Sequence, residues 1–437
     1  MKRLNTWKRF GVLALVGLLL SWVVSCATVT PNAENDDRQE IEFWTMQLQP
    51  QFNDYFNKLI ANFEAENPDL KVRWVDVPWS AMESKILAAV SAKTAPDVVN
   101  LNPDFAALLA GRNAWLDLDE QVSDEARSQF LENIWKASRI QTCDGENCSL
   151  KTFGLPWYLT TQITIYNTDL FEKAELKKSP QTYTELAEVA QQVREKTGKY
   201  AFFVSFVPED SSQILQSFVQ MGVQLVDEKG QAAFNTPEGQ AAFQYWVDLY
   251  QQGLLPQEVL TQGHRRAIEL YQAGETAILT SGPQFFKAIA ENAPTIAKVS
   301  TPAPQITGET GKKSVAVMNL VIPRETPDPE SALKFALFVT NSTNQLAFAK
   351  AANVLPSTVT ALENGYFRPV QGRESQEDQA RIISAKQMDE TDILLPPLED
   401  IKQLQKIIYE NLQAAMLNLK TVEQAILDAE DAWNQRS

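Results

Sequence analysis

The side chains that most often perform catalysis are few in this sequence and poorly grouped. Asp97, Asp104 and Asp117 fall in one region, but no pair stands out from the acidic background as the two carboxylates that a glycosidase needs. His264 is the only histidine, and we expect it to be solvent-exposed at a helix start. A single histidine excludes most zinc and histidine-dependent nucleophile chemistry, and no Gly-x-Ser-x-Gly motif occurs. We therefore expect no enzyme, no bound metal and no cofactor.

Cys143 and Cys148 flank an Asp-Gly dipeptide, which is a turn signal. Two thiols this close together favour a disulfide in an oxidising compartment. A metal site is the alternative, but it requires more ligands, and no histidine stands nearby. We expect the disulfide, as a local cross-link with little bearing on activity.

The first residues have the pattern of an export signal. A basic start precedes an apolar run from Phe10 to Val24, which is shorter than the ~20 residues that a helix needs to span a bilayer. Its ending, Val23-Val24-Ser25-Cys26, resembles a bacterial lipobox. We expect residues 1–25 to be a lipoprotein signal peptide, Cys26 to carry a lipid, and residues 26–39 to form a flexible tether. An uncleaved anchor or an ordinary cut near Ala27 is the alternative.

Length and charge restrict the remaining possibilities. The chain has 437 residues, too many for one hydrophobic core, so two domains are expected. Its formal net charge is −16, and four positive residues lie in the signal, so the rest is more acidic still. This balance argues against nucleic acid and anionic membranes as partners. It also makes an anionic ligand less favoured.

Apolar spacing predicts strands that alternate with helices at the start of the fold. Strands are expected at 41–45, 71–75 and 96–101, with helices at 52–67 and 80–93 between them. This rhythm predicts a parallel sheet covered on both faces, and ligands then gather at the carboxyl ends of its strands, here after Trp44 and after Leu101. Later strands are expected at 162–167, 277–280 and 315–321, and later helices at 182–196 (capped by Thr182), 211–222, 237–253, 330–350 and 396–436.

Five short motifs occur in a fixed order along residues 40–437. They are Ile41-Glu42-Phe43-Trp44-Thr45 with Phe63 to Pro68, then Ala95 to Val99, then Gly154-Leu155-Pro156-Trp157-Tyr158 with Ile165-Tyr166-Asn167, then Gly274 to Ile278 with Ser281-Gly282-Pro283, and finally Ser331 to Phe335 with Pro356. In this order and spacing the chain resembles the extracellular solute-binding proteins of bacterial ABC importers. More narrowly, it is similar to the maltose-binding-protein-like family of sugar binders.

The resemblance implies an α/β, two-lobed periplasmic-binding-protein fold of type II, with the ligand held in a cleft and released by a hinge motion. Lobe one would hold 40–152 plus 314–356, and lobe two 160–310 plus 360–437, with hinge crossings near 153–159, 311–314 and 356. The implied protein is a lipid-anchored monomer outside the cytoplasmic membrane. It would deliver a small-molecule sugar to the permease subunits of an ABC transporter, with a cytoplasmic ATPase behind them.

A sugar site needs aromatic platforms and polar groups that donate and accept hydrogen bonds. The resemblance places such residues in the cleft loops and adds a carboxylate at Asp104, whereas the aromatic residue often found at the position of Gln284 is absent, so Phe285 or Phe206 would replace it. The predicted ligand contacts are Met46, Gln47, Gln49, Asn102, Asp104, Trp157, Tyr158, Thr160, Phe206, Ser281, Gly282, Gln284, Phe285, Met318 and Asn319.

Several of these residues also have a structural interpretation. Asp104 could cap the helix that follows it, and Gln47 and Gln49 could be ordinary loop residues. For Trp157 and Tyr158, ligand contact and core packing are equally expected. A disaccharide or a glucosyl-polyol osmolyte is the first candidate ligand. A polyamine or other small-solute receptor on the same scaffold is the alternative, and a secreted glycosidase is a remote one.

Overall fold

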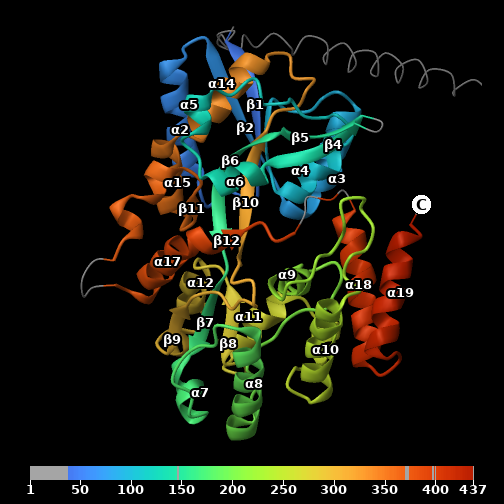
Figure 1. Cartoon of the computed structure of the whole chain (residues 1–437). Helices are drawn as coiled ribbons and strands as arrows, with labels where there is room; N and C mark the ends of the chain where they lie inside the picture. Colours follow the sequence, from blue (N-terminus) through green and yellow to red (C-terminus); the bar gives the residue numbers. More distant parts are fainter. Residues whose placement is uncertain (1–37, 145–146, 370–373, 396–397, 399, 437) are drawn as a thin grey trace, which may run out of the picture.

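The computed structural model describes residues 38–144, 147–369, 374–395, 398 and 400–436. Figure 1 shows two α/β bodies, one above the other, joined by a narrow middle section. We call the upper body lobe one and the lower body lobe two. The predicted signal peptide, Cys26 and nearly all of the predicted tether lie outside the described residues.

Lobe one is built on a mixed sheet with the strand order β11-β6-β10-β3-β1-β2. Its strands are β1 (Gln39–Met46), β2 (Leu70–Val77), β3 (Val98–Leu101), β6 (Gly154–Thr161), β10 (Lys313–Val321) and β11 (Leu355–Pro356). β1 pairs in parallel with β2 and β3, as the strand–helix rhythm predicts. β10 runs antiparallel between β3 and β6, so a segment from late in the chain completes the centre of the sheet.

Helices cover both faces of this sheet, because successive strand residues point to opposite faces and apolar residues occur on both. Phe43 of β1 faces one core, and its neighbour Trp44 faces the other. The helices of lobe one are α2 (Asn53–Glu66), α3 (Trp79–Ser91), α4 (Pro103–Ala110), α5 (Asp124–Arg127), α6 (Glu132–Ala137), α14 (Pro329–Val339), α15 (Ser342–Ala352) and α16 (Val359–Leu362). A hairpin of β4 (Arg139–Asp144) and β5 (Asn147–Thr152) pairs Cys143 with Cys148 in register; their side chains lie outside the described residues.

Strands β6 and β10 approach each other closely at one glycine. A Cβ at Gly154 would lie 2.8 Å from the Cβ of Asn319, so only glycine fits without a shift. A bulge follows: Met318 pairs with Tyr158 and Asn319 with Pro156, which leaves Trp157 without a partner in β10. The Gly-x-Pro sequence at 154–156 is therefore paired strand, and the bulge follows it at Trp157.

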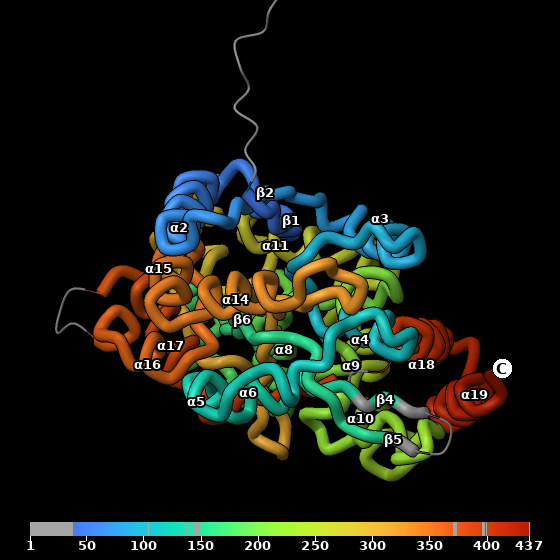
Figure 2. The backbone as a smooth tube through the Cα atoms, turned by 90° about the horizontal axis from the view of Figure 1, so that it is seen from above, coloured from blue at the N-terminus to red at the C-terminus, as the bar shows by residue number. Residues whose placement is uncertain are grey.

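Lobe two has a three-stranded sheet in the order β8-β7-β9, and a single apolar core surrounds it. Its strands are β7 (Ile163–Asn167), β8 (Ile278–Ser281) and β9 (Ser300–Ala303). Its helices are α7 (Thr168–Lys173), α8 (Tyr183–Thr197), α9 (Gln213–Gln220), α10 (Pro237–Gln251), η1 (Gln257–Leu260), α11 (His264–Gln272), α12 (Phe285–Asn292), α13 (Pro294–Ala297), α18 (Ile401–Met416) and α19 (Val422–Asn434). In both Figure 1 and Figure 2, α18 and α19 lie together at one side of the molecule.

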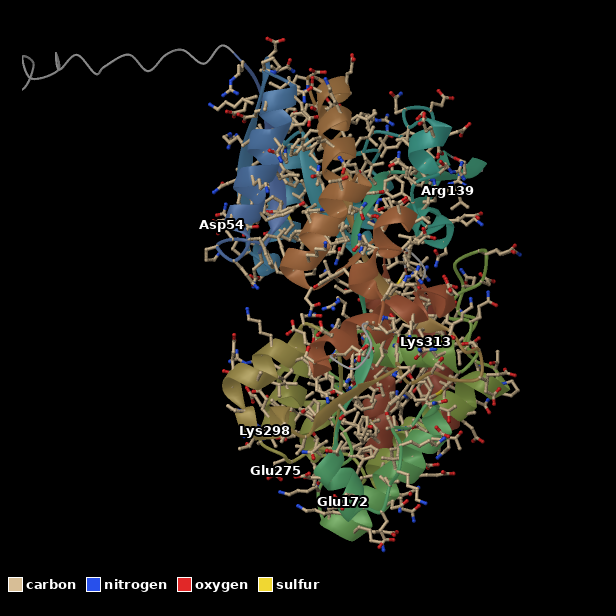
Figure 3. All side chains as sticks on the ribbon, turned by 90° about the vertical axis from the view of Figure 1, so that its left-hand side faces the viewer. Asp54, Arg139, Glu172, Glu275, Lys298 and Lys313 are labelled. Carbon is tan, nitrogen blue, oxygen red and sulfur yellow. The ribbon has the colours of Figure 1, made fainter. Side chains whose placement is uncertain are left out.

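The chain passes between the lobes three times. The first passage is at Gln162 between β6 and β7, and the second is 304–312 between β9 and β10. The third contains η2 (Gly365–Phe367), α17 (Gln376–Lys386), η3 (Gln387–Glu390) and β12 (Thr391–Asp392), which pairs in parallel with β10 at Lys313 and Ser314. Figure 3 shows Lys313 between the two bodies.

These passages shift two of the expected boundaries. Residues 154–159 of the expected crossing 153–159 lie inside β6, and residue 356 pairs inside the sheet of lobe one rather than marking a passage. The expectation assigned all of 360–437 to lobe two. Helices α18 and α19 do pack in its core, but Phe367 and Met388 pack against Leu159 and Leu355 of lobe one.

Candidate ligand-binding site

A cavity of about 200 Å³ lies at the first passage, where the ends of several elements meet. Amides and hydroxyls supply most of its wall, and no Asp, Glu, Lys or Arg of the described chain lines it. The lining residues are Thr160, Thr161, Gln162, Ser211, Gln213, Gln216, His264, Thr280, Ser281, Gly282, Gln284, Phe285, Ser314 and Ala316. Such a wall suits a neutral ligand that both donates and accepts hydrogen bonds.

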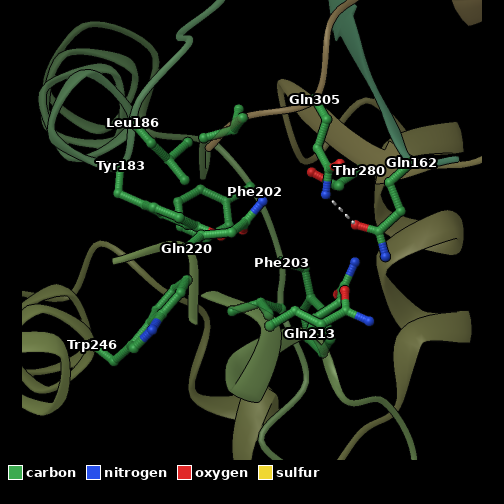
Figure 4. Close-up of a pocket in the computed structure, with 13 residues that line it drawn as sticks. Gln162, Tyr183, Leu186, Phe202, Phe203, Gln213, Gln220, Trp246, Thr280 and Gln305 are labelled. Carbon is green, nitrogen blue, oxygen red and sulfur yellow. Dashed lines mark hydrogen bonds between the residues drawn. The ribbon is translucent and has the colours of Figure 1, made fainter. Parts of the chain in front are cut away.

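A second, smaller cavity of about 50 Å³ shares part of its wall with the first, and Figure 4 shows the residues that line it. Gln162, Gln213, Gln216 and Thr280 line both cavities. The smaller one ends at Gln220, whose Oε1 accepts a hydrogen bond of 2.6 Å from the Tyr183 hydroxyl. It has room for only a few water molecules, so of these two cavities the larger is the better match to a solute.

Helix α9 presents its glutamines to these cavities because of their spacing. Gln213, Gln216 and Gln220 recur at i, i+3 and i+7, which places them on one face of a helix. The apolar residues Ile214, Leu215 and Phe218 are buried on the other side, in the core of lobe two. The helix is therefore fixed by its apolar face, and Gln213 and Gln216 line both cavities. Gln220 is 1% exposed, and its Nε2 donates to the backbone oxygen of Lys312 at 2.9 Å.

Thr161 brings a buried hydroxyl to the cavity wall. Its side chain is 2% exposed, and its Oγ1 has no hydrogen-bond partner among the described residues. A buried hydroxyl without a partner is costly, by about 1–3 kcal/mol.

His264 and Phe285 form the aromatic part of the wall. Their ring centroids lie 6.4 Å apart in an edge-on arrangement, and both side chains are half-buried. The backbone N–H of His264 donates to Asp210 at 2.8 Å. Burial lowers the pKa of His264, and the nearby Asp210 carboxylate raises it by less, so the imidazole favours its neutral form. The expectation of a solvent-exposed His264 was wrong.

Five of the predicted contacts do meet in this cavity. Thr160 comes from the end of β6, and Ser281, Gly282, Gln284 and Phe285 come from the turn between β8 and α12. Both sets follow a strand that ends at the cleft, which is where α/β sheets hold their ligands.

A second group lies at the ends of β1 and β3 and does not line the cavity. Met46 is buried in a core of lobe one, whereas Gln47 and Gln49 are exposed. The Oδ1 of Asn102 caps α4 by accepting from the N–H of Phe105 at 2.9 Å. Asp104 lies in the first turn of α4, and its side chain is outside the described residues.

A third group packs inside the lobes in this conformation and does not line the cavity. Trp157 and Phe206 are 0% exposed. Met318 and Asn319 are buried within the central strand β10. Tyr158 is half-buried, and its ring packs edge-on against Trp157 at 5.0 Å. In this conformation Trp157 and Phe206 offer no surface to a ligand, because both side chains are fully buried.

Sequence reasoning missed the glutamines of the wall and one exposed aromatic residue. The i, i+3, i+7 spacing of Gln213, Gln216 and Gln220 was the available signal for the glutamines. Trp79, at the start of α3, is 45% exposed, and its ring centroid lies 6.4 Å from that of Phe105. It is the type of residue that a sugar platform uses, but it does not line the cavity described here.

Comparison with known proteins identifies the class. The family model for bacterial extracellular solute-binding proteins matches residues 49–346. The chain belongs to this family. A crystal structure of a candidate oligosaccharide periplasmic-binding protein from Synechococcus sp. MITs9220 is 43% identical, covers 90% of this chain and 98% of that chain, and superposes with a TM-score of 0.83. The predicted family and the two-lobed fold are therefore confirmed.

More distant relatives share the fold of this solute-binding protein. The maltose-bound MalE3 structure from T. maritima is 21% identical with a TM-score of 0.70, and covers 90% of this chain and 98% of that one. The mannitol-binding protein of Pseudomonas aeruginosa is 24% identical over 314 residues, which are 69% of this chain and 70% of that protein. Within the described residues, no helix has the length and apolarity to cross a bilayer, and no group of three or more acidic, histidine or cysteine side chains is placed to hold a metal.

Proposed function

We propose that this solute-binding protein captures an uncharged, hydroxyl-rich solute of the sugar or sugar-alcohol class in the 200 Å³ cavity and delivers it to the permease subunits of an ABC importer. The observation that carries the proposal is the wall itself, which offers amides and hydroxyls but no charged carboxylate, ammonium or guanidinium among the described residues. Sugars carry many hydroxyls and no charge, so their hydrogen bonds can be satisfied there without burying an unpaired ion.

The composition of the wall also bears on the alternative. A polyamine receptor requires carboxylates to pair with its cationic ligand, because an ammonium group loses hydration when it is buried. The described cavity wall has none. Phe285 supplies one apolar face for a sugar ring, and the relatives named above include proteins described as oligosaccharide, maltose and mannitol binders.

The cavity limits the size of the solute in this lobe arrangement. Its volume of about 200 Å³ is below the ~300–1,000 Å³ of a typical small-molecule pocket. One sugar ring or one linear polyol is a better match than a long oligosaccharide. A longer ligand would need the lobes to move apart and use the exposed Trp79 as a further platform.

The remaining features of the importer component are part of the same proposal. Cys26 would carry the lipid that tethers the protein outside the cytoplasmic membrane, after removal of residues 1–25. The protein would act as a monomer, with 40–152 plus 314–356 forming most of lobe one. Cys143 and Cys148 would form a disulfide at the tip of their hairpin, where the backbone places them opposite each other.

The test is thermal unfolding of the protein against glucose, maltose, maltotriose, mannitol, a glucosyl-glycerol and spermidine. A solute that binds the folded state stabilises it by RT ln(1 + [L]/Kd), which is about 2.7 kcal/mol at a hundredfold excess over Kd. A shift with one or more sugars or polyols is expected. A shift with spermidine alone would contradict the proposal.

A pair of variants locates the site. Gln216→Leu removes a cavity amide and should weaken binding of the responding sugar by about three- to tenfold, the worth of one neutral hydrogen bond. Gln251→Leu is the control, because Gln251 lies in the same lobe, bonds to the backbone oxygen of Ala415 at 3.1 Å and does not line the cavity. Equal effects of the two changes would refute this cavity as the site.

A further inference from the structure

Each of the three passages between the lobes contributes one glutamine to a single buried cluster. Gln162 forms the first passage, Gln305 lies near the start of the second, and Gln387 lies in the third. Gln305 and Gln387 are each 4% exposed, and Gln162 is half-buried at the cavity wall. We call these three residues the hinge amides. Glutamine is rarely buried this fully without partners, so its hydrogen bonds identify what the cluster does.

The hinge amides join every pair of passages. The Nε2 of Gln305 donates to the Oε1 of Gln162 at 3.3 Å, a bond that Figure 4 draws as a dashed line. The Nε2 of Gln387 donates to the backbone oxygen of Gln162 at 2.7 Å. The backbone N–H of Gln305 donates to the Oε1 of Gln387 at 3.3 Å, which closes the ring. The Oε1 of Gln305 also accepts from the N–H of Ser314 at 2.8 Å, so the start of β10 is included.

These bonds depend on how the lobes are oriented. A hinge motion turns the three passages relative to one another, and hydrogen bonds between residues of different passages lose their length and angle in that turn. An amide as buried as those of Gln305 and Gln387 costs more to leave without its partner than a hydrogen bond normally contributes, because its lost hydration is then uncompensated. The ring of bonds therefore favours the lobe arrangement in which it is complete.

Other contacts between the second and third passages do not replace the ring of hydrogen bonds made by the hinge amides. Lys312 pairs with Asp392 at 2.6 Å, but both side chains are about half-exposed, and such ion pairs contribute little. Lys313 pairs with Glu390, whose side chain is 59% exposed. Neither pair includes Gln162, whereas the hinge amides connect it to both other passages.

We infer that Gln162, Gln305 and Gln387 are positioning residues that set the resting angle between the lobes. Gln162 has a second role by its location, because it lines the ligand cavity as well as the hinge. The inference concerns the protein without solute and goes beyond the proposed function. Its truth does not depend on which solute binds.

The chain contains its own reporter of the lobe angle. Lys402 of α18, in lobe two, forms an ion pair with Glu83 of α3, in lobe one. The Nζ of Lys402 also lies 5.1 Å from the ring centroid of Phe105 in lobe one. Within lobe two, Lys196 pairs with Glu175 at 3.0 Å and does not depend on the hinge. A carbodiimide joins an amine directly to a carboxylate, so mass spectrometry can compare the yields of the two cross-links.

The experiment uses Gln305→Leu in the full chain, without any added solute. We expect the Lys402–Glu83 cross-link to fall relative to the Lys196–Glu175 cross-link, since losing one net hydrogen bond lowers the equilibrium constant for the complete lobe arrangement by about fivefold. Gln251→Leu, which changes a glutamine outside the hinge, should leave the ratio unchanged.

An unchanged ratio in Gln305→Leu would overturn the inference, because the lobe angle would then not depend on the hinge amides. If Gln305→Leu lowers both cross-links through unfolding, Gln387→Leu decides in its place by the same ratio. A fall of equal size in Gln251→Leu would also contradict the inference. No sugar enters the measurement, so failure of the proposed function would leave this result intact.

Discussion

Trp157 gives the sharpest test of how the structure distinguishes packing from ligand contact. Its ring is 0% exposed and is surrounded by other aromatic rings of lobe one. The centroid distances are 4.9 Å to Phe348, 5.0 Å to Tyr158, 5.9 Å to Phe56 and 6.2 Å to Phe43. The substitution Trp157→Ala removes this ring from the centre of a core and should act on stability rather than on binding.

The magnitude follows from the packing. Truncation of a buried tryptophan or phenylalanine to alanine costs about 3–5 kcal/mol, and aromatic pairs add about 0.5–1.5 kcal/mol beyond their buried area. With four such neighbours, Trp157→Ala belongs near the upper end of that range. One effect of the substitution reduces this loss of stability. The Nε1 of Trp157 is buried without a partner among the described residues, and the substitution removes that unpaired N–H. We therefore expect a loss of about 4 kcal/mol.

Urea unfolding measures the loss as a shift in midpoint at constant slope, and binding of the responding sugar is measured below the transition. Trp79→Ala is the matched control, because Trp79 is 45% exposed and its removal should change stability by less than about 1 kcal/mol. We expect the sugar affinity of Trp157→Ala to stay within about threefold of the wild type, since the ring does not line the cavity. A large loss of affinity with little loss of stability would refute the reasoning.

Three further outcomes are expected. Burial lowers the pKa of His264 from its ordinary value of 6.5, so the unfolded chain binds the proton more readily than the folded chain. The free energy of unfolding should therefore fall as the pH drops from about 6.5 through the lowered pKa of the folded state. The variant His264→Gln should flatten that part of a profile of melting temperature against pH. Gly154→Ala should destabilise the protein by about 1–3 kcal/mol in urea unfolding, since the added Cβ would lie 2.8 Å from the Cβ of Asn319. An unchanged unfolding midpoint would mean that β6 and β10 can move apart at no cost. Cys148→Ser should lower stability by about 2 kcal/mol under oxidising conditions and not in reductant, if Cys143 and Cys148 form the short disulfide loop; equal melting under both conditions would exclude the bond.

Local patterns predicted much of the fold correctly. The alternation of strands and helices from β1 to β3 follows from apolar spacing within short windows, and the structure has those elements in parallel pairing. Thr182 caps α8 as expected, with its hydroxyl accepting from the N–H of Glu185 at 3.2 Å. Such features depend on residues a few positions apart, so a single sequence contains the information.

Features set by distant contacts were not predictable in the same way. The bulge at Trp157 exists because β10, about 160 residues later, pairs out of step with β6, and a Gly-x-Pro turn and a bulged strand have similar sequences. The cavity glutamines of α9 were visible as one helical face, but periodicity does not reveal whether a polar face meets solvent or a cleft. The hinge amides come from three separate segments, and only the folded chain brings them together.

The central position of β10 has a consequence for how the protein must be made. Strands β1, β2 and β3 are synthesised first and β6 soon after, but the strand that joins them spans Lys313–Val321. Until those residues emerge, the inner edges of β3 and β6 carry unpaired backbone groups beside apolar side chains, which is the state in which sheets aggregate. A chain with this order gains from being kept extended until it is complete. If the proposed signal peptide directs the chain through a secretion channel as an unfolded polypeptide, that passage would provide the delay.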